Sequence, residues 1–219
     1  MYHTVLFDLD GTLTDSKEGI LNSLRYAFEK LGEPLPGEGL LSKFIGPPLQ
    51  DSLMRYCGFS QEKALRGIAF FRERYSVTGK FENAAAPGMV ELCRRLRERG
   101  CVLALSSSKP EGMCVPICEK FGFAPYLSAI VGSPPDGDWE KADVIRETLR
   151  RLGLTEADKS GVLMVGDRKF DVLGARECGV DCVGVEFFGY ADPGELAQSG
   201  AAAVVDTAEA LERFILSAE

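Results

Sequence analysis

Acidic and hydroxyl side chains follow three short apolar runs of this sequence. Asp8 and Asp10 stand one residue apart in LFDLDGTLTDS, Ser107 follows VLAL, and Asp167 and Asp171 follow VLMVG. Carboxylates that meet in one crevice repel each other, and their ionisation is costly unless a cation neutralises them. If the runs are neighbouring strands, the pattern therefore predicts a site for a divalent metal ion.

Magnesium suits such a site, because it prefers oxygen ligands and binds a few carboxylates together with a substrate phosphate. The chain has a net charge of -8, so the ion also lets an acidic protein bind an anion. A carboxylate is a competent nucleophile for a phosphoryl group, and a second one can move the proton of the leaving oxygen. Lys141 and the Ser107 hydroxyl could hold the remaining phosphoryl oxygens. The chemistry predicted is phosphoryl transfer.

Each piece also has a plain structural interpretation. An Asp-x-Asp pair after a strand is often a solvated turn, and Gly-Asp-x-x-x-Asp often caps a helix. Lys141 could face solvent, and residues 106–108 could form only a loop. The joint occurrence of these pieces, each after an apolar run and in this order, favours a catalytic site.

The elements that must position these residues are buried strands alternating with helices. Short apolar runs bounded by turn residues predict strands at Thr4–Leu9, Val102–Leu105, Ala129–Val131, Val162–Val165, Cys182–Val185 and Ala202–Val205. Apolar residues at helical spacing predict helices between them, at Met89–Arg99, Lys141–Leu152 and Asp171–Cys178. This alternation predicts an α/β fold with a doubly wound parallel sheet, which binds ligands at the carboxyl ends of its strands.

Residues 16–82 break the alternation, because they show helical periodicity and no convincing strand. Asp15-x-x-Glu18 predicts a capping box at the start of a helix that Gly32 ends. Further helices are predicted around Leu49–Tyr56 and Gln61–Tyr75. We therefore expect a core made of residues 1–15 and 84–219, with residues 16–83 inserted as a small helical domain.

Composition restricts the partners. The residues are 45% hydrophobic and 26% charged, which is typical of a globular protein. The negative charge argues against nucleic acid, and no apolar run approaches the roughly 18 residues of a membrane span. With no secretory signal expected, the seven cysteines are predicted to be reduced, packed thiols of a cytoplasmic protein. His3 is the only histidine, which argues against a histidine base.

The motifs DLDGTLTDS, SSSK, a later lysine and GDRKFD resemble the four motifs of the haloacid dehalogenase-like hydrolases. The resemblance implies a Rossmann-like core with a helical cap inserted after the first motif, and a magnesium cofactor. It implies that Asp8 is the nucleophile that forms an aspartyl-phosphate. Asp10 would be the general acid/base and would ligate magnesium through its backbone carbonyl. Asp167 would ligate the metal, and Asp171 would be a further ligand or a water-mediated support.

The resemblance also assigns the second and third motifs. Aligning Ser-Lys-Pro with the Asn-Lys-Pro of phosphoglycolate phosphatase relatives puts Ser107 at the hydroxyl position, with Ser106 as the alternative. Lys141 would be the third-motif lysine. Contacts to phosphate or substrate are predicted for Gly11, Ser108, Lys109 and Gly46.

The implied activity is hydrolysis of a small phosphate monoester. Asp10 favours phosphate esters, because haloacid dehalogenases lack an acid/base at its position. Ala-Asp-Val after Lys141, in place of Pro-x-Pro, resembles the 5'-nucleotidase-like branch more than the phosphoglycolate phosphatases. One alternative is a β-phosphoglucomutase-like transferase, although such enzymes typically carry an acidic residue where this chain has Gly166. From another class, the alternative is a non-catalytic module that senses phosphate.

The inserted helical domain is expected to set substrate choice. The loop FIGPPL, residues 44–49, resembles the cap segment of phosphoglycolate phosphatase-like proteins. Candidate substrate contacts are Phe44, Gln50, Arg55 and Arg72. The expected partner is a small phosphate monoester, without nucleic acid or membrane, and the expected state is a monomer or weak dimer.

Overall fold

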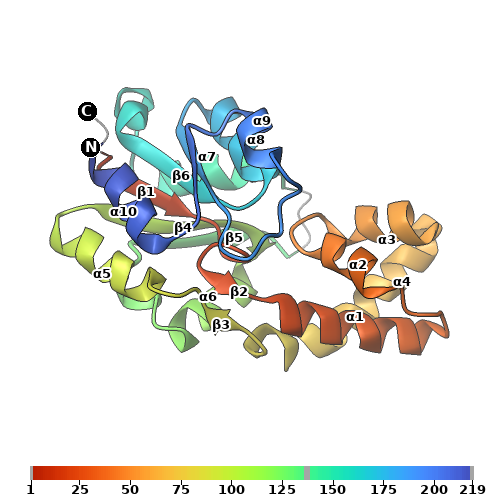
Figure 1. The fold of residues 1–219 in the computed structure, drawn as a ribbon. Helices are drawn as coiled ribbons and strands as arrows, with labels where there is room; N and C mark the ends of the chain where they lie inside the picture. Colours follow the sequence, from red (N-terminus) through yellow and green to blue (C-terminus); the bar gives the residue numbers. More distant parts are fainter. Residues whose placement is uncertain (1, 136–138, 218–219) are drawn as a thin grey trace. The chain divides into compact units, whose positions relative to one another are not determined.

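The computed structural model describes residues 2–135 and 139–217, which fold into two compact units. Unit 1 is Met1–Thr14 with Ala85–Glu219, and unit 2 is Asp15–Ala84. The described part of unit 1 holds a six-stranded parallel sheet in the order β5-β4-β1-β6-β7-β8. Figure 1 labels β5, β4, β1 and β6 of this sheet. Its strands are β1 (Thr4–Phe7), β4 (Val102–Pro110), β5 (Ala129–Ser133), β6 (Val162–Gly166), β7 (Asp181–Val185) and β8 (Ala203–Val205).

Helices cover both faces of this sheet. One apolar core lies under α5 (Met89–Glu98), α6 (Glu111–Lys120) and α10 (Ala208–Ser217). The other core lies under α7 (Lys141–Arg151), α8 (Lys169–Cys178) and α9 (Glu195–Ser199). Neighbouring residues of β1 point to opposite faces, so Phe7 joins the first core and Leu6 the second. The predicted doubly wound α/β fold is confirmed.

The strand order reverses at β1. From β1 the chain proceeds outward to β4 and β5, then returns across the sheet to β6 and continues to β7 and β8. Phe7, the last residue of β1, pairs with Leu105 on one side and with Val165 on the other. The carboxyl end of β1 is therefore the topological switch point, where open α/β sheets bind their ligands.

Several strand ends differ from the prediction. β5 and β6 end later, at Ser133 and Gly166, and the ends of β1 and β4 bear on the site. β1 ends at Phe7 and not at Leu9, because the Leu9 carbonyl accepts hydrogen bonds from the amides of Leu13 (3.0 Å) and Thr14 (2.9 Å) and so closes a turn. β4 continues past Leu105 to Pro110, with a register shift against β5 after Ser107. The SSSK segment is therefore the irregular end of a strand and not a loop.

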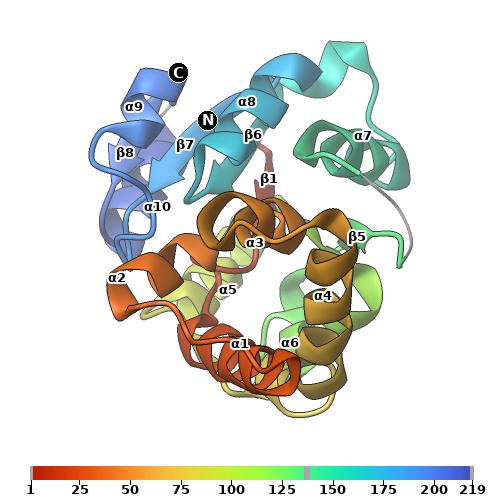
Figure 2. The ribbon, with the colours of Figure 1, turned by 90° about the vertical axis from the view of Figure 1, so that its right-hand side faces the viewer.

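Unit 2 is helical, as Figure 2 shows. α1 (Lys17–Leu31) packs against α4 (Gln61–Tyr75), and α4 also contacts α3 (Leu49–Cys57). Between residues 16 and 83, the structure describes helices and turns and no strand. Paired strands β2 (Thr14–Asp15) and β3 (Ala84–Ala85) form the connections to unit 1. Unit 2 also holds the short helix α2 (Glu38–Leu41) and two 3-10 helices, Ser42–Phe44 and Gly79–Phe81.

The predicted capping box at Asp15 and Glu18 is wrong. The residue that caps α1 is Ser16, one position later, and its side chain makes no capping hydrogen bond. The Asp15 carboxylate instead accepts a hydrogen bond from the Lys17 amide at 3.1 Å. The other end is as predicted, because Gly32 adopts a left-handed conformation that closes the helix.

The cysteines are free thiols, and all of them are buried except Cys57, which is half-buried. Burial raises the pKa of Cys93 to about 12, so this thiol stays protonated and packs as an apolar group. Among the described residues, no helix combines the length and apolarity that crossing a membrane requires.

Candidate active site

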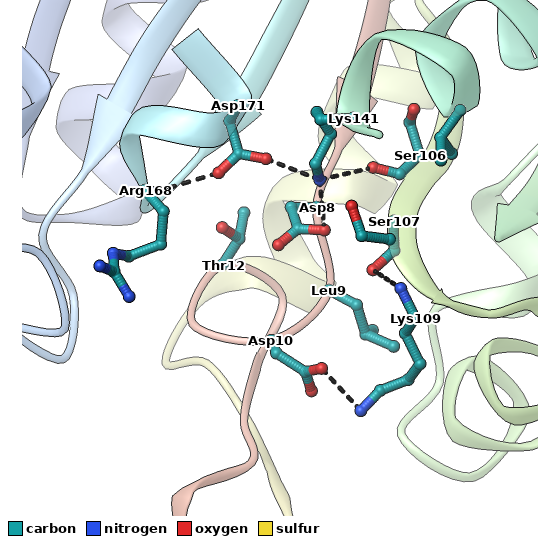
Figure 3. Close-up of polar contacts among 12 residues, drawn as sticks. Asp8, Leu9, Asp10, Thr12, Ser106, Ser107, Lys109, Lys141, Arg168 and Asp171 are labelled. Atoms are coloured by element: carbon teal, nitrogen blue, oxygen red, sulfur yellow. Dashed lines mark hydrogen bonds and ion pairs between the residues drawn. The ribbon is translucent and has the colours of Figure 1, made fainter. Parts of the chain in front are cut away.

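Asp8 stands at the switch point, directly after β1. Its amide donates to the Val165 carbonyl at 2.9 Å, which continues the pairing of β1 with β6 and fixes the backbone. One of its carboxylate oxygens, Oδ1, lies 2.7 Å from the Nζ atom of Lys141. Lys141 is the first residue of α7, so a helix start and a strand end bring these two side chains together (Figure 3).

The Lys141 ammonium is buried among acceptors. Besides Asp8, it lies 2.6 Å from Asp171 Oδ1 and donates to the Ser106 carbonyl at 3.1 Å. Burial alone would lower its pKa, but attraction to Asp171 and Asp8 outweighs burial and raises the pKa well above its ordinary value. Lys141 is therefore a fixed positive charge, and the interpretation that it faces solvent is wrong.

Asp167 and Asp171 complete a cluster with Asp8. Each of the three offers a carboxylate oxygen, and these oxygens lie within 4.8 Å of one another. Burial, then repulsion from Asp171 and Asp8, raises the pKa of Asp167 well above its ordinary value, and burial raises that of Asp171 to about 6. Three close carboxylates facing one ammonium leave negative charge unbalanced, so the donor set fits a divalent cation.

The turn after β1 is built around Asp167. Gly11 has φ +85°, and a Cβ atom there would lie 2.1 Å from Asp167 Oδ2. Only glycine therefore fits beside this carboxylate. This steric reason for a glycine at position 11 stands beside the prediction that Gly11 contacts the ligand. Thr12 donates its hydroxyl hydrogen to Asp167 Oδ1 at 3.3 Å. Sequence reasoning missed Thr12, although its place in the Gly-Thr turn beside the aspartates was a signal.

Asp171 is held by the segment that precedes it. Its Oδ2 atom accepts a hydrogen bond from the Arg168 amide at 3.1 Å, which closes the turn at the start of α8. A Cβ atom at Gly166 would lie 2.2 Å from the Asp171 carboxyl carbon. A side chain at position 166 and the observed position of Asp171 therefore exclude each other.

Asp10 lies outside the carboxylate cluster. Its Oδ2 atom forms an ion pair with the Nζ atom of Lys109 at 2.6 Å, and both side chains are largely buried (Figure 3). The two residues come from the turn after β1 and from the end of β4. Their pairing brings the predicted acid/base and a predicted phosphate contact together, while metal ligation by the Asp10 carbonyl stays a prediction.

The serines of β4 have different environments. Ser107 Oγ accepts a hydrogen bond from the Lys109 amide at 3.3 Å. Ser106 is fully buried, and its hydroxyl has no hydrogen-bond partner among the described residues. Ser108 is exposed, and its carbonyl accepts from the Ser133 hydroxyl at 2.9 Å. The choice between Ser106 and Ser107 as the second-motif hydroxyl stays a prediction.

The remaining candidates belong to unit 2. Gly46 has φ +99° and precedes α3. Phe44 is buried, with its ring 5.8 Å from that of Tyr56, an arrangement typical of a packing residue. Gln50 is half-buried, and Arg55 and Arg72 are exposed. Their roles as substrate contacts stay predictions.

The four motifs thus converge at one edge of the sheet. The chain was also compared with models of known protein families. The family model described as "Haloacid dehalogenase-like hydrolase" matches residues 5–185. This chain belongs to the haloacid dehalogenase-like hydrolases. The family that the motifs resembled is therefore confirmed.

Similar proteins include several phosphatases. A 5'-nucleotidase of Pseudomonas aeruginosa is 42% identical, with 87% of this chain and 86% of that protein covered. A phosphoglycolate phosphatase of Cupriavidus necator is 32% identical, with 98% and 93% covered. The tyrosine-protein kinase PtkA of Mycobacterium tuberculosis is 39% identical over 86% of this chain, which spans only 64% of that protein.

A solved structure shares the fold over the whole length. It is a predicted phosphatase from Clostridium acetobutylicum, 38% identical, with a TM-score of 0.91 and complete coverage of both chains. Together with the family, these similarities confirm the prediction of a hydrolase of the phosphatase class.

Proposed function

We propose that this chain is a magnesium-dependent phosphatase that hydrolyses a small phosphate monoester through an aspartyl-phosphate on Asp8. One observation carries the proposal. The carboxylates of Asp8, Asp167 and Asp171 cluster at the switch point of the sheet, and the buried Lys141 ammonium contacts Asp8 and Asp171. This set combines a nucleophile, a metal-binding group and a fixed positive charge.

In the first half of the reaction, the Asp8 carboxylate attacks phosphorus. The bond between phosphorus and the leaving oxygen breaks, and Asp10 gives its proton to that oxygen, so an alcohol departs. Lys141 keeps Asp8 oriented through the 2.7 Å contact. Ser107 and Lys109, at the end of β4, hold phosphoryl oxygens.

In the second half, Asp10 takes a proton from water, and the water oxygen attacks phosphorus. The bond between phosphorus and Asp8 then breaks, which frees inorganic phosphate and restores the carboxylate. A bound magnesium ion, held by Asp8, Asp167 and Asp171, would supply charge neutralisation that lets a carboxylate approach an anionic phosphoryl group.

The substrate class proposed first is a nucleoside 5'-monophosphate. Support comes from the relative named 5'-nucleotidase, which has a higher identity, 42%, than the relative named phosphoglycolate phosphatase, 32%. The residues after Lys141 point the same way. Phosphoglycolate is the second substrate to test.

The mutase alternative is disfavoured by Gly166. An acidic residue there would occupy the space of the Asp171 side chain, because even a Cβ atom would lie 2.4 Å from Asp171 Cβ. Product analysis with a hexose 1-phosphate separates the two reactions. The phosphate-sensing module is disfavoured because the nucleophile, acid/base, lysine and metal-binding acids are all present.

Replacement of the nucleophile tests the mechanism. Asp8→Asn removes the attacking charge with little change in volume, so hydrolysis of a generic aryl phosphate should fall by at least about 1,000-fold. The matched control is Asp206→Asn, an exposed aspartate that also follows a strand, and its turnover should equal that of the wild type. Turnover by Asp8→Asn near the wild-type rate, in a folded protein, would contradict the mechanism.

A substrate panel tests the class of ester. Nucleoside 5'-monophosphates, phosphoglycolate and sugar phosphates are compared by released phosphate, with magnesium and with chelator. A kcat/KM at least about tenfold higher for a nucleotide than for phosphoglycolate is expected. Location in the cytoplasm and a monomeric or weakly dimeric state are further proposals, which cell fractionation and light scattering would check.

A further inference from the structure

A buried acid outside the four motifs contacts the metal-binding segment. Glu195 is the first residue of α9, and its side chain is only 7% exposed. Its Oε1 atom accepts hydrogen bonds from Arg168 Nε at 3.0 Å and from the Lys169 amide at 2.9 Å. Its Oε2 atom lies 3.4 Å from a second Arg168 nitrogen and from the Asp192 amide, both of which donate to it.

The partners of Glu195 lie between the two predicted metal-binding acids, Asp167 and Asp171. Arg168 and Lys169 are the two residues that follow Asp167 and lead into α8. The Arg168 amide is also the donor that holds Asp171. One short segment is therefore bound from two sides, by Glu195 through the Arg168 side chain and the Lys169 amide, and by Asp171 through the Arg168 amide.

Glu195 is ionised in this position. Burial alone would raise its pKa, but hydrogen bonds from the Arg168 side chain and the Lys169 amide outweigh burial and lower the pKa. The Arg168 side chain is also mostly buried, at 12% exposed, so the pair has a defined geometry and is not a mobile surface contact.

We propose that Glu195 is a positioning residue, which acts through Arg168 and Lys169 to hold Asp167 and Asp171 in the geometry that binds a divalent cation. The inference rests on the proposed function. Groups that orient metal ligands typically change metal affinity by 10- to 100-fold when they are removed. Glu195 lies 24 residues beyond Asp171 in the chain, so the C-terminal part of the fold takes part in building the site.

Magnesium binding without substrate tests the proposal. Glu195→Ala removes both sets of hydrogen bonds, and its dissociation constant for Mg²⁺, measured by calorimetry, should rise by about tenfold or more. Glu195→Gln keeps an acceptor for the Lys169 amide but loses the charge, so its affinity should lie between those of the wild type and Glu195→Ala. Turnover of an aryl phosphate by Glu195→Ala should recover to within about twofold of wild type at saturating magnesium.

The matched control is Glu212→Ala. Glu212 forms a similar ion pair in unit 1, with bonds of 3.0 Å and 2.8 Å to Arg95, but it joins α10 to α5 and contacts no metal-binding residue. This variant should lose thermal stability and keep wild-type magnesium affinity. If Glu195 had only a structural role, Glu195→Ala would behave like Glu212→Ala, with lower thermal stability and wild-type magnesium affinity.

The outcomes separate the inference from the function on which it rests. Wild-type affinity in both alanine variants overturns the positioning role and leaves the proposed function intact. Absence of magnesium binding by the wild-type protein overturns both. If Glu195→Ala fails to fold, Glu195→Gln and Arg168→Gln decide, because weaker binding in both supports the role and unchanged binding in both refutes it.

Discussion

The Lys141 ammonium compensates only part of the charge around it. It contacts Asp8 and Asp171 directly, whereas Asp167 is bound by the hydroxyl of Thr12. Burial raises the pKa values of Asp167 and Asp171, so both carboxylates hold a proton more tightly than an exposed aspartate does. At the scale of single residues, burial disfavours the charged forms of these acids, and a bound cation would offset that cost.

Burial of the Asp171 carboxyl makes stability depend on pH. The pKa of Asp171 is about 6 in the folded protein against an ordinary 3.8, so the folded state binds the proton more tightly than the unfolded chain. The stabilisation is complete only well below pH 3.8 and is lost as the pH rises through 6. In chelator, the unfolding free energy of wild type minus that of Asp171→Asn should fall by on the order of 2 kcal/mol between pH 4 and 7.

Chemical denaturation at several pH values measures this difference. Asp206→Asn is the control, because it replaces an exposed aspartate outside the carboxylate cluster. Magnesium replaces the proton, so it should raise the unfolding midpoint of the wild type more at pH 7 than at pH 5. A difference between wild type and Asp171→Asn that grew with pH in chelator would show that Asp171 is not a buried, proton-binding acid.

At the scale of elements, the approach of α7 to α8 decides where Lys141 lies. A Cβ atom at Gly174 of α8 would be 2.8 Å from Lys141 Cγ and 3.0 Å from the Ala142 amide nitrogen. The missing side chain lets the start of α7 pack against α8. From this position the Lys141 side chain reaches Asp8, with its Nζ atom 2.7 Å from Oδ1.

Filling this contact should disturb the site. Gly174→Ala puts a methyl group against backbone and the base of a side chain, which cannot move freely, so it should cost about 1–3 kcal/mol of stability and lower kcat by about tenfold or more. Gly112→Ala is the matched control, because this helical glycine of α6 has open space and should be neutral or stabilising. Equal behaviour of the two variants, in thermal unfolding and turnover, would contradict a packing role for Gly174.

At the scale of the whole molecule, we propose that unit 1 carries the catalytic residues and unit 2 selects the substrate. Unit 1 holds the nucleophile, the lysine and the metal-binding acids on one sheet edge. Unit 2 begins at Asp15, at the end of the first motif, and ends at Ala84, before α5. Its proposed role as a cap that selects substrate implies that its residues affect the leaving group more than the phosphoryl group.

Arg55 tests this division. Arg55→Ala should raise KM for the preferred natural substrate by about threefold or more and leave kcat for an aryl phosphate within about twofold. Arg25→Ala serves as the control, because it also removes an exposed arginine from a helix of unit 2 but was not a candidate contact. If both variants had equal kcat and KM values on every ester in the panel, Arg55 would not determine substrate specificity.

The sequence alone predicted the parallel α/β fold, the helical insertion and the family. It also named the residues that the sheet brings together: Asp8, Lys141, Asp167 and Asp171. The predictions of the fold class and the family succeeded because their signals are local. Apolar runs, helical spacing and turn glycines are written in neighbouring residues, and parallel strands place their carboxyl ends at one edge whatever their order.

Only the tertiary structure decided which side chains pair. It revealed the Asp10–Lys109 ion pair, the hydrogen bond from Thr12, and the bonds from Arg168 to Glu195. It also extended β4 through the second motif and buried Phe44. These contacts join residues far apart in the chain and depend on strand order, helix packing and rotamers. No periodic or turn pattern in a single sequence encodes them, because they arise only when separate elements are packed together.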